Sequence, residues 1–412
     1  MSTTTHVDID LWSSASFADG HPVAQYRWLQ ENAPVYRHEE PGGRGFWAVT
    51  TAALVRQGSR MPEVLANRDG MTMYDLDPES LVRMRRMLMF MDPPEHTRWR
   101  KLVNSEFTPR GAGRWAPFID ALAEDIVDEV CETGECELIT QVAGLLPSYV
   151  VAELLGVPRA EGVRLYELTE VMHSALDAVT VEQRNQAQGE MMQFTTALHA
   201  AKMENPDDTL ASRLAHAELD GKRIDVVDFS LFILLLVNGG GDTVRNCVGG
   251  AVLSLLADPG ALNAFRANPE ALKSTATEEF LRYQSPAVFQ RRTATQDTEF
   301  GGVEIAEGDK VLLYFGAANR DPALFDRPDE LLLDREPNPQ MAFGAHGPHY
   351  CLGAHFARLE IGAMMGRLVT RLPNLQLAGE PTWLASNFIS GPTYVPVTFT
   401  PTARVNTGEP HA

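Results

Sequence analysis

The chain has 412 residues, of which 44% are hydrophobic and 22% are charged, so it can bury a large core. Its 55 acidic and 35 basic side chains give a net charge of −20, which argues against nucleic acid or an anionic membrane as its main partner. No apolar run reaches the roughly 18 residues of a membrane span, and the first residues lack a basic-then-apolar leader pattern. Its four cysteines form no dense framework, which is typical of a reducing compartment. We therefore expect a cytoplasmic protein without a membrane anchor.

The first third of the chain mixes short elements of both kinds. The pattern predicts a short helix at 22–32 and strands at 34–38 and 45–50. Seven methionines follow between residues 61 and 91, where few apolar positions repeat with a helical period. This methionine-rich segment has an adaptable apolar surface, which suits either a core or a binding pocket.

Long amphipathic helical patterns dominate the middle of the chain, and strand-like segments return toward its end. No linker, repeat or low-complexity tract separates independent parts, so we expect a single domain over 1–412. The expected α-rich part covers about 90–283 and 352–370, and the expected β-rich part covers about 34–60, 285–315 and 375–400.

One helical pattern is unusually long, running from Asp225 to about Leu256, which is about 48 Å at 1.5 Å per residue. Its centre reads GGGDT, from Gly239 to Thr243, and each helical glycine costs about 1 kcal/mol relative to alanine. One interpretation is that the helix ends there, with Gly241 as C-cap and Asp242 as N-cap. The other is that the missing side chains open a groove against a planar ligand, beside Asp242 and Thr243. These five residues alone slightly favour the helix break.

The segment from Phe343 to Gly353 is the most informative one, and it reads FGAHGPHYCLG. Its glycines at 344 and 347 allow positive φ and close approach of a flat group. Cys351 stands at the expected N-terminus of a helix, where the dipole favours the thiolate. A thiolate held this way is a suitable axial ligand for haem iron.

Two other interpretations of the same cysteine remain open at this point. Cys351 could be a buried structural thiol. Alternatively, His346, His349 and His355 could join Cys351 in a zinc site, although the usual paired ligand spacings are absent.

Further motifs elsewhere in the chain decide between them. The motifs are His96 and Arg100 in an H-x-x-x-R pattern, the GGGDT segment, Glu279 and Arg282 in an E-x-x-R pattern, Arg292 in QRRTAT, Asp334–Arg335 after ANRDP, and finally Cys351. In this order and spacing the chain resembles the cytochrome P450 monooxygenases over nearly its whole length, most of all the soluble bacterial ones. Two positions depart from the common pattern: nine residues instead of eight run from Phe343 to Cys351, and Val244 replaces a frequent hydroxyl residue.

The resemblance implies a fold, a cofactor and a set of site residues. The fold would be the triangular-prism cytochrome P450 fold, mainly α with a smaller β portion, with haem b between the long central helix and the cysteine-bearing helix. The iron ligand would be Cys351. The other haem contacts would be His96, Arg100, Gly239, Arg292, Phe343, His349 and Gly353. Oxygen activation would use Asp242 and Thr243, the buried structural cluster would be Glu279, Arg282 and Arg335, and the substrate contacts would be Met71, Leu235, Asn238, Val288, Phe289 and Ile389.

The resemblance also implies an activity: insertion of one oxygen atom of O2 into an apolar small molecule such as a terpenoid, steroid, long-chain lipid or natural-product intermediate. Electrons would come from a separate ferredoxin and ferredoxin reductase. The expected docking patch for that donor is basic and consists of Arg98, Lys101, Arg110, Arg114 and Arg358. The alternatives are a peroxide-driven haem oxidase and a haem-binding sensor without turnover.

Overall fold

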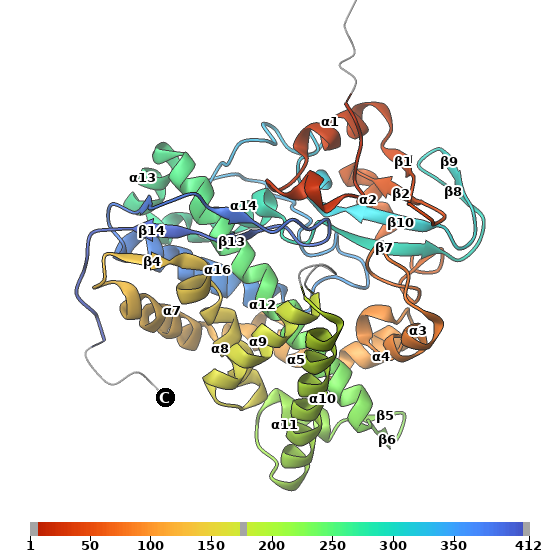
Figure 1. Cartoon of the computed structure of the whole chain (residues 1–412), viewed down its shortest axis with the longest axis horizontal. Coiled ribbons are helices and arrows are strands. Elements are labelled where there is room, and N and C mark those ends of the chain that lie inside the picture. The colour runs from red at the N-terminus through yellow and green to blue at the C-terminus, as the bar shows by residue number, and fades with distance from the viewer. Residues whose placement is uncertain (1–6, 174–178, 407–412) are drawn as a thin grey trace, which may run out of the picture.

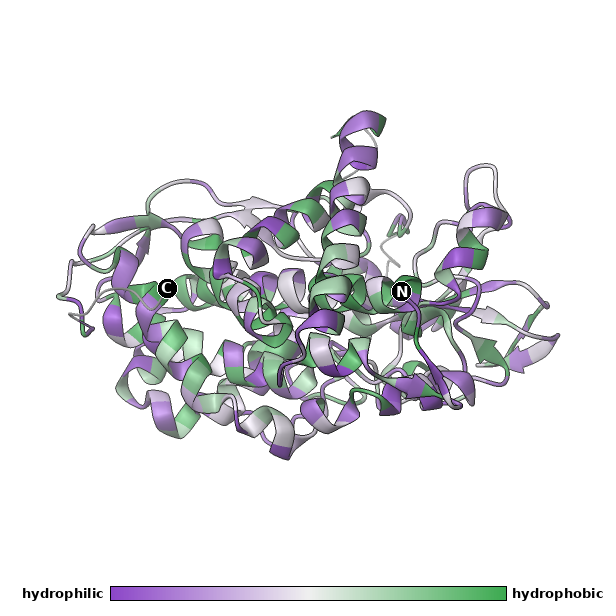
Figure 2. Cartoon of the chain, turned by 90° about the horizontal axis from the view of Figure 1, so that it is seen from below, coloured by the Kyte–Doolittle hydropathy of each residue, from purple (hydrophilic) through white to green (hydrophobic). Residues whose placement is uncertain are grey.

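A computed structural model describes residues 7–173 and 179–406 of the chain. Most helices gather on one side of the molecule, and the largest sheet lies on the other (Figure 1). Hydrophobic segments concentrate toward the middle, while hydrophilic ones run along the outer helices and loops (Figure 2). This arrangement confirms a mainly helical fold with a smaller β portion.

The helices are α1 (Val23–Asn32), α2 (Ala52–Gly58), α3 (Pro78–Met84), α4 (Glu95–Lys101), α5 (Asn104–Phe107), α6 (Pro109–Gly113), α7 (Ala116–Val130), α8 (Leu145–Leu155), α9 (Arg159–His173), α10 (Val181–Glu204), α11 (Leu210–Ala215), α12 (Val226–Ala257), α13 (Pro259–Ala267), α14 (Pro269–Gln284), α15 (Phe315–Ala318) and α16 (Ala354–Arg371). Three short helical turns accompany them: η1 (Ser14–Phe17), η2 (Leu88–Phe90) and η3 (Ile139–Ala143).

The strands are β1 (Val35–His38), β2 (Phe46–Val49), β3 (Leu65–Ala66), β4 (Glu135–Glu137), β5 (Glu218–Leu219), β6 (Lys222–Arg223), β7 (Phe289–Ala294), β8 (Thr298–Phe300), β9 (Val303–Ile305), β10 (Lys310–Tyr314), β11 (Gln376–Leu377), β12 (Thr382–Trp383), β13 (Pro392–Tyr394) and β14 (Pro396–Thr398). The expected helix at 22–32 and strands at 34–38 and 45–50 match α1, β1 and β2.

The largest sheet has five strands in the order β1-β2-β10-β7-β3, so strands from residues 35–66 flank strands from 289–314. The pairing of β10 with β2 is parallel, and the others are antiparallel. Because side chains alternate along a strand, Gln290 and Arg292 of β7 lie on one face and Phe289 and Arg291 on the other. This alternation decides which arginine reaches the site described below.

Helix α12 is continuous through its three glycines, so the helix-break interpretation is wrong. Its N-terminus is capped by Asp225, whose carboxylate accepts from the N–H groups of Val227 and Asp228. Among the described residues it is the one single helix long and apolar enough to cross a membrane. However, it contacts α8, α9, α10, α14 and α16, as the central helix of a packed core does (Figure 1).

The three glycines of α12 face different surroundings. A side chain at Gly241 would meet the Tyr166 ring at 2.7 Å, and one at Gly240 would meet Val151 at 3.1 Å. Of these three glycines, only Gly239 has no atom of a described residue within 4 Å of the position that a Cβ would take. Gly239 is therefore the one of the three glycines that leaves open space where the expected groove would lie, whereas Gly241 must be small because Tyr166 of α9 packs against it.

Candidate active site

The cysteine loop doubles back on itself before α16. Gly344 has φ +93°, and the next two residues, Ala345 and His346, are also left-handed at +53° and +62°. A non-glycine residue in this region costs of order 1–2 kcal/mol. Gly347 does not have positive φ, contrary to expectation; its small size matters because any Cβ would collide with the Ser59 carbonyl.

The backbone of this loop fixes Cys351. Its N–H donates to the Phe343 carbonyl over 2.8 Å, and α16 begins three residues later with Gly353 as its N-cap. Burial raises the pKa of the Cys351 thiol, while the N–H of Gly353 and the charges of Arg100 and Arg358 lower it. A metal ion deprotonates a coordinating thiol outright, so these three groups would stabilise a metal-bound thiolate.

A group of buried nitrogen donors lies near this cysteine. The rings of His96 and His349 are 4.1 Å apart between centroids, and both residues are buried. Burial and then Arg100 lower the pKa of His96 to about 4. Burial and then Arg292 lower the pKa of His349 well below its usual value. Neither ring nitrogen of His349 has a well-formed hydrogen bond to any described residue.

Arg292 and Arg100 belong to the same group of donors. Arg292 is 3% exposed and donates to the Arg291 carbonyl at 2.9 Å; burial lowers its pKa to about 10. Among the residues that the structure describes, Arg100 makes only a long contact of 3.4 Å, to the Pro348 carbonyl, and burial lowers its pKa. Gln290, on the same face of β7 as Arg292, keeps its amide oxygen buried without a partner among the described residues.

These observations test whether haem fits the chain. Buried cations and donors whose pKa values are lowered by burial need anionic partners, because an unpaired buried charge is strongly unfavourable. The two propionates of haem are such anions, and charge-assisted hydrogen bonds to them are strong. The residues therefore fit haem. The sequence missed Gln290, although its two-residue spacing from Arg292 in a strand was a usable signal.

On the opposite side of this region, the Thr243 hydroxyl donates to the Gly239 carbonyl one helical turn earlier, at 3.2 Å. Asp242 pairs with Arg245 at 3.3 Å, and Arg245 also pairs with Glu170 of α9. The Arg245 guanidinium stacks over the Tyr166 ring at 4.9 Å. No local sequence pattern indicated this cluster, because α9 and α12 meet only in the fold.

Part of the methionine-rich segment forms an apolar cluster against the first half of α12. Met87, Phe90 and Leu231 are its buried centre. The partly buried members packed around them are Met71, Leu81, Met84, Met89, Leu234 and Leu235. Two expected substrate contacts, Met71 and Leu235, thus lie in one apolar wall.

The other four expected substrate contacts lie in different surroundings. Asn238 has a buried side-chain oxygen without a partner among the described residues, and Ile389 forms a single β-bridge with Ala287. Val288 and Phe289 are fully buried in a separate core cluster. Phe289 packs against Tyr314 and Phe388, on the face of β7 away from Arg292. We therefore remove Phe289 from the expected substrate contacts.

The zinc interpretation is wrong. Within residues 7–173 and 179–406, no three His, Cys, Asp or Glu side chains come close enough together to hold a metal ion. The ring of His346 stacks on Tyr350 instead of approaching Cys351, with 4.8 Å between centroids.

The expected basic patch is partly neutralised. Arg98 pairs with Asp220, Arg114 with Glu106, and Arg358 with Glu278. Lys101 and Arg110 are exposed and have no ion pair to a described residue. Only these two members of the patch therefore keep an uncompensated charge.

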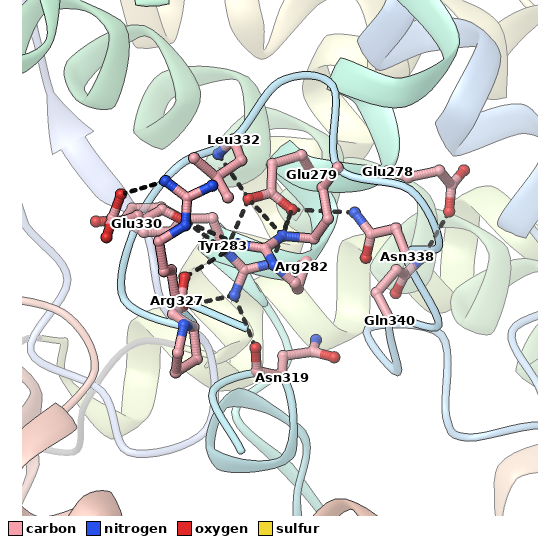
Figure 3. A network of polar contacts seen from close by, with 12 residues as sticks. Glu278, Glu279, Arg282, Tyr283, Asn319, Arg327, Glu330, Leu332, Asn338 and Gln340 are labelled. Atoms are coloured by element: carbon pink, nitrogen blue, oxygen red, sulfur yellow. Dashed lines mark hydrogen bonds and ion pairs between the residues drawn. The ribbon is translucent and has the colours of Figure 1, made fainter. Parts of the chain in front are cut away.

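Glu279 and Arg282 meet in a buried polar network (Figure 3), and Arg335 donates to the same Glu279 carboxylate. The loop carbonyls of Asn319, Pro328 and Glu330 accept from Arg282, so the cluster fixes the segment that leads into the cysteine loop.

Comparison with known proteins gives consistent matches. The family model described as Cytochrome P450 matches residues 272–378. The chain is 35% identical over 407 residues to a steroid C26-monooxygenase of Mycolicibacterium smegmatis, covering 97% of this chain and 98% of that one. It is 34% identical to a methyl-branched lipid omega-hydroxylase of Mycobacterium tuberculosis, covering 95% of each. Among solved structures, a Mycobacterium marinum cytochrome P450 in complex with pseudoionone superposes with a TM-score of 0.89 at 32% identity, covering 97% of this chain and 100% of that one.

Proposed function

Since this chain belongs to the cytochrome P450 family and is therefore a haem-thiolate monooxygenase acting on apolar molecules, we propose that it hydroxylates a terminal methyl group on a branched alkyl chain. The observation that carries the proposal is that two relatives named for different molecules, a steroid and a methyl-branched lipid, share this position of attack by their names. In a steroid, C26 is an end carbon of the branched side chain, and an omega carbon is an end carbon by definition.

The haem would be held by residues from four separate segments. Cys351 would ligate the iron, and Phe343 and Gly353 would enclose the sulfur. His96, Arg100, Arg292, His349 and Gln290 would surround the propionates, and Gly239 would leave room beside the macrocycle. Bound haem supplies the reductive activation of O2, from which one oxygen atom enters a C–H bond and the other leaves as water.

The chain's own contribution to the reaction is proton delivery and exclusion of water. Thr243 can turn its Oγ1 proton from the Gly239 carbonyl toward O2 or a water molecule. Asp242 stands next to it and connects through Arg245 to Glu170, whose side chain is 44% exposed. The Arg245 guanidinium stays protonated, so it holds the Asp242 carboxylate in place, and Asp242 can pass a proton to the Thr243 hydroxyl.

The apolar wall supports a flexible hydrocarbon as the substrate. Met71, Met84 and Met89 are unbranched and adapt to irregular shapes, so they accommodate methyl branches that a rigid wall would reject. The wall's members carry no charge, and hence an alkyl tail can bury there without leaving a charged group unpaired.

We further propose that the chain is one domain in the cytoplasm and receives its electrons from a separate ferredoxin and ferredoxin reductase. Two other functions remain as alternatives: a peroxide-driven oxidase and a haem-binding sensor. The acid–alcohol pair Asp242 and Thr243 favours the oxygen-dependent monooxygenase, because a peroxide-driven enzyme needs no such relay.

The test is turnover by the haem-loaded protein with NADH, a ferredoxin and its reductase. Cholestenone and phytanic acid carry branched tails, and progesterone and palmitic acid are the matched molecules without them. We expect terminal hydroxylation of the branched pair, identified by mass spectrometry, and little product from the controls. Ring hydroxylation, or equal oxidation of progesterone and palmitic acid, would contradict the proposal. Equal turnover with hydrogen peroxide alone would favour the first alternative, and spectral binding without product would favour the sensor.

A further inference from the structure

We propose that Met71, Met84 and Met89 of the apolar wall are a modification site: hydrogen peroxide released at the active site oxidises their thioethers to sulfoxides, and the oxidised wall loses its affinity for an apolar substrate. The inference rests on the proposed binding of an alkyl chain at this wall. It adds a reversible switch that stops turnover when O2 is reduced without forming product.

The first observation is the distribution of the methionines. Seven of the 15 methionines lie between residues 61 and 91, so nearly half of them occupy less than a tenth of the chain. Leucine or isoleucine would fill a core with better-defined rotamers, whereas methionine is flexible and specifies a packed core poorly. Packing alone therefore does not call for this residue type, and the feature that distinguishes it from leucine is an oxidisable sulfur.

The second observation is which of these sulfurs a small oxidant can reach. Met71, Met84 and Met89 are only partly buried, so part of each side chain is accessible. Met73 belongs to the same segment but is fully buried, and its sulfur accepts a hydrogen bond from the Asn387 amide at 3.2 Å. The three wall methionines should therefore react first, and Met73 should resist.

The third observation is what surrounds the three thioethers. Apart from methionines, every member of this cluster is a leucine or a phenylalanine, so none of its side chains can donate a hydrogen bond. A sulfoxide is polar, and its oxygen would face these side chains without a partner. An apolar molecule that covers the oxidised wall would remove water from that oxygen, and its binding should weaken.

The fourth observation is the position of the wall relative to the oxygen site. Leu235 of the wall stands one helical turn before Gly239 on α12, and Thr243 stands one turn after it. Residues four apart lie on the same face of a helix, and eight residues span about 12 Å along its axis. Peroxide formed beside Thr243 would therefore meet the wall methionines before it reached bulk solvent.

The chemistry balances with reagents that the proposed function supplies. Two electrons from the ferredoxin and two protons convert O2 to hydrogen peroxide when no product forms. The thioether sulfur then donates an electron pair to one peroxide oxygen, so that an S–O bond forms and the O–O bond breaks. The other oxygen leaves as water with both protons. Sulfur is oxidised by two electrons, and peroxide is reduced by two.

The test makes the haem-loaded protein generate peroxide at its own site. The protein is incubated in air with NADH, ferredoxin and reductase but no substrate, and catalase destroys any peroxide that escapes into solution. Peptide mass spectrometry measures the gain of one oxygen atom at each methionine. Met192 of α10 is the comparison, because at 49% exposure it is the most exposed of the described methionines and lies outside the wall.

We expect oxidation of Met71, Met84 and Met89 in the presence of catalase, while Met73 and Met192 stay unmodified. In a second arm hydrogen peroxide is added without catalase, and Met192 should then be oxidised as well. This arm requires no electron donor.

The second readout is the Kd of phytanic acid, measured from the haem spectrum per intact haem before and after oxidation. We expect the Kd to rise on the order of tenfold, as for burial of an unpartnered polar group. Methionine sulfoxide reductases A and B, which each reduce one sulfoxide epimer, should restore it. They do not repair damaged haem, so recovery assigns the loss to methionine.

The matched variants replace sulfur at constant size. The triple variant Met71→Leu, Met84→Leu and Met89→Leu keeps the apolar volume and should fold. Compared with itself before and after added peroxide, it should keep its Kd within about twofold. Met192→Leu should lose affinity as the wild type does. The three single variants are compared in the same way, and each should lose less affinity than the wild type.

Three results would overturn the inference while leaving the proposed function intact: oxidation of Met192 before the wall during turnover with catalase, an unchanged Kd once the wall is oxidised, or an equal loss of affinity in the triple variant. Absence of NADH consumption would instead overturn the proposed electron supply, and the arm with added peroxide would still decide the inference. A protein that binds no branched alkyl molecule before oxidation would overturn the proposed function, and the inference with it.

Discussion

Glu279 and Arg282 meet through two parallel hydrogen bonds of 2.8 Å at a place where neither side chain has any solvent exposure (Figure 3). The remaining N–H groups of Arg282 donate to the carbonyls of Asn319, Pro328 and Glu330, so all five of its donors are used. Glu279 in turn accepts from Arg335. In a fully paired buried network of this kind, removing any one side chain leaves its partners buried without a hydrogen bond or counter-charge and lowers the stability of the fold.

Replacing Glu279 by alanine should leave two arginines buried without their carboxylate and cost about 3–5 kcal/mol of unfolding free energy. We expect little soluble haem protein from Glu279→Ala, measured as holo-protein yield and urea unfolding. The neighbouring Glu278→Gln is the control, because its partner Arg358 is 28% exposed, and it should lose about 1 kcal/mol or less. A normal yield of Glu279→Ala would show that the network is dispensable.

Arg292→Met should have opposite effects on the two forms of the protein. Without haem, Arg292 is buried and donates only to a carbonyl among the described residues, while Asp92 raises its pKa without a hydrogen bond to it, so the methionine variant should unfold at a higher temperature than the wild type. With haem, the loss of a propionate partner should speed haem transfer to apomyoglobin about tenfold or more. Arg292→Lys keeps the charge, so its rate of haem transfer should lie between those of the wild type and of Arg292→Met. If both forms change in the same direction, Arg292 is not a haem contact.

Thr243→Ala should uncouple NADH consumption from product formation. The alanine cannot present a proton at the position of Oγ1, so more of the reducing equivalents should appear as hydrogen peroxide, measured against product and NADH consumed. Thr243→Ser keeps the hydroxyl and should keep most of the coupling. The contact of Oγ1 with the Gly239 carbonyl is weak at 3.2 Å, hence both variants should remain folded. Unchanged coupling in Thr243→Ala would remove this residue from proton delivery.

Stability should depend on pH through His21. Its Nε2 contacts the carbonyls of Gln284 and Ser285 at 2.9 and 3.1 Å. Burial and then the charge of Arg320 lower the pKa of His21 to about 3. The folded imidazole is thus neutral, while an unfolded histidine takes up a proton near pH 6.5, so the unfolded state binds more protons between these values. The His21 contribution is therefore complete above about pH 6.5 and is lost progressively as the pH falls below it, by up to about 1.4 kcal/mol per pH unit.

Urea unfolding from about pH 8 to about pH 5 measures this effect. His21→Gln keeps an N–H donor for the two carbonyls and does not titrate, so its unfolding free energy should fall less steeply below pH 6.5. Parallel slopes for the two proteins would mean that other groups cause the acid sensitivity.

Much of the site was predictable because its groups stand in short, local patterns. Glu279 and Arg282 are one helical turn apart, and the glycine-rich loop fixes Cys351 within a few residues, so neither depends on distant parts of the chain. The helix-break interpretation at Gly241 was wrong because helical propensity is a weak local preference, and the packing of the Tyr166 ring against Gly241 overrides it.

Residue type and spacing therefore determined the mainly helical fold, the cysteine ligand and the class of chemistry, since these follow from patterns among residues close together in the chain. Only the tertiary structure decided which charges are free and which are paired. The charge of Arg98 in the expected basic patch is neutralised by Asp220, which lies 122 residues away in the chain. Asp242 and Glu170 of α9 both pair with Arg245. Ion pairs between distant segments depend on how the helices pack against one another, and no local sequence pattern predicts which distant residues become neighbours.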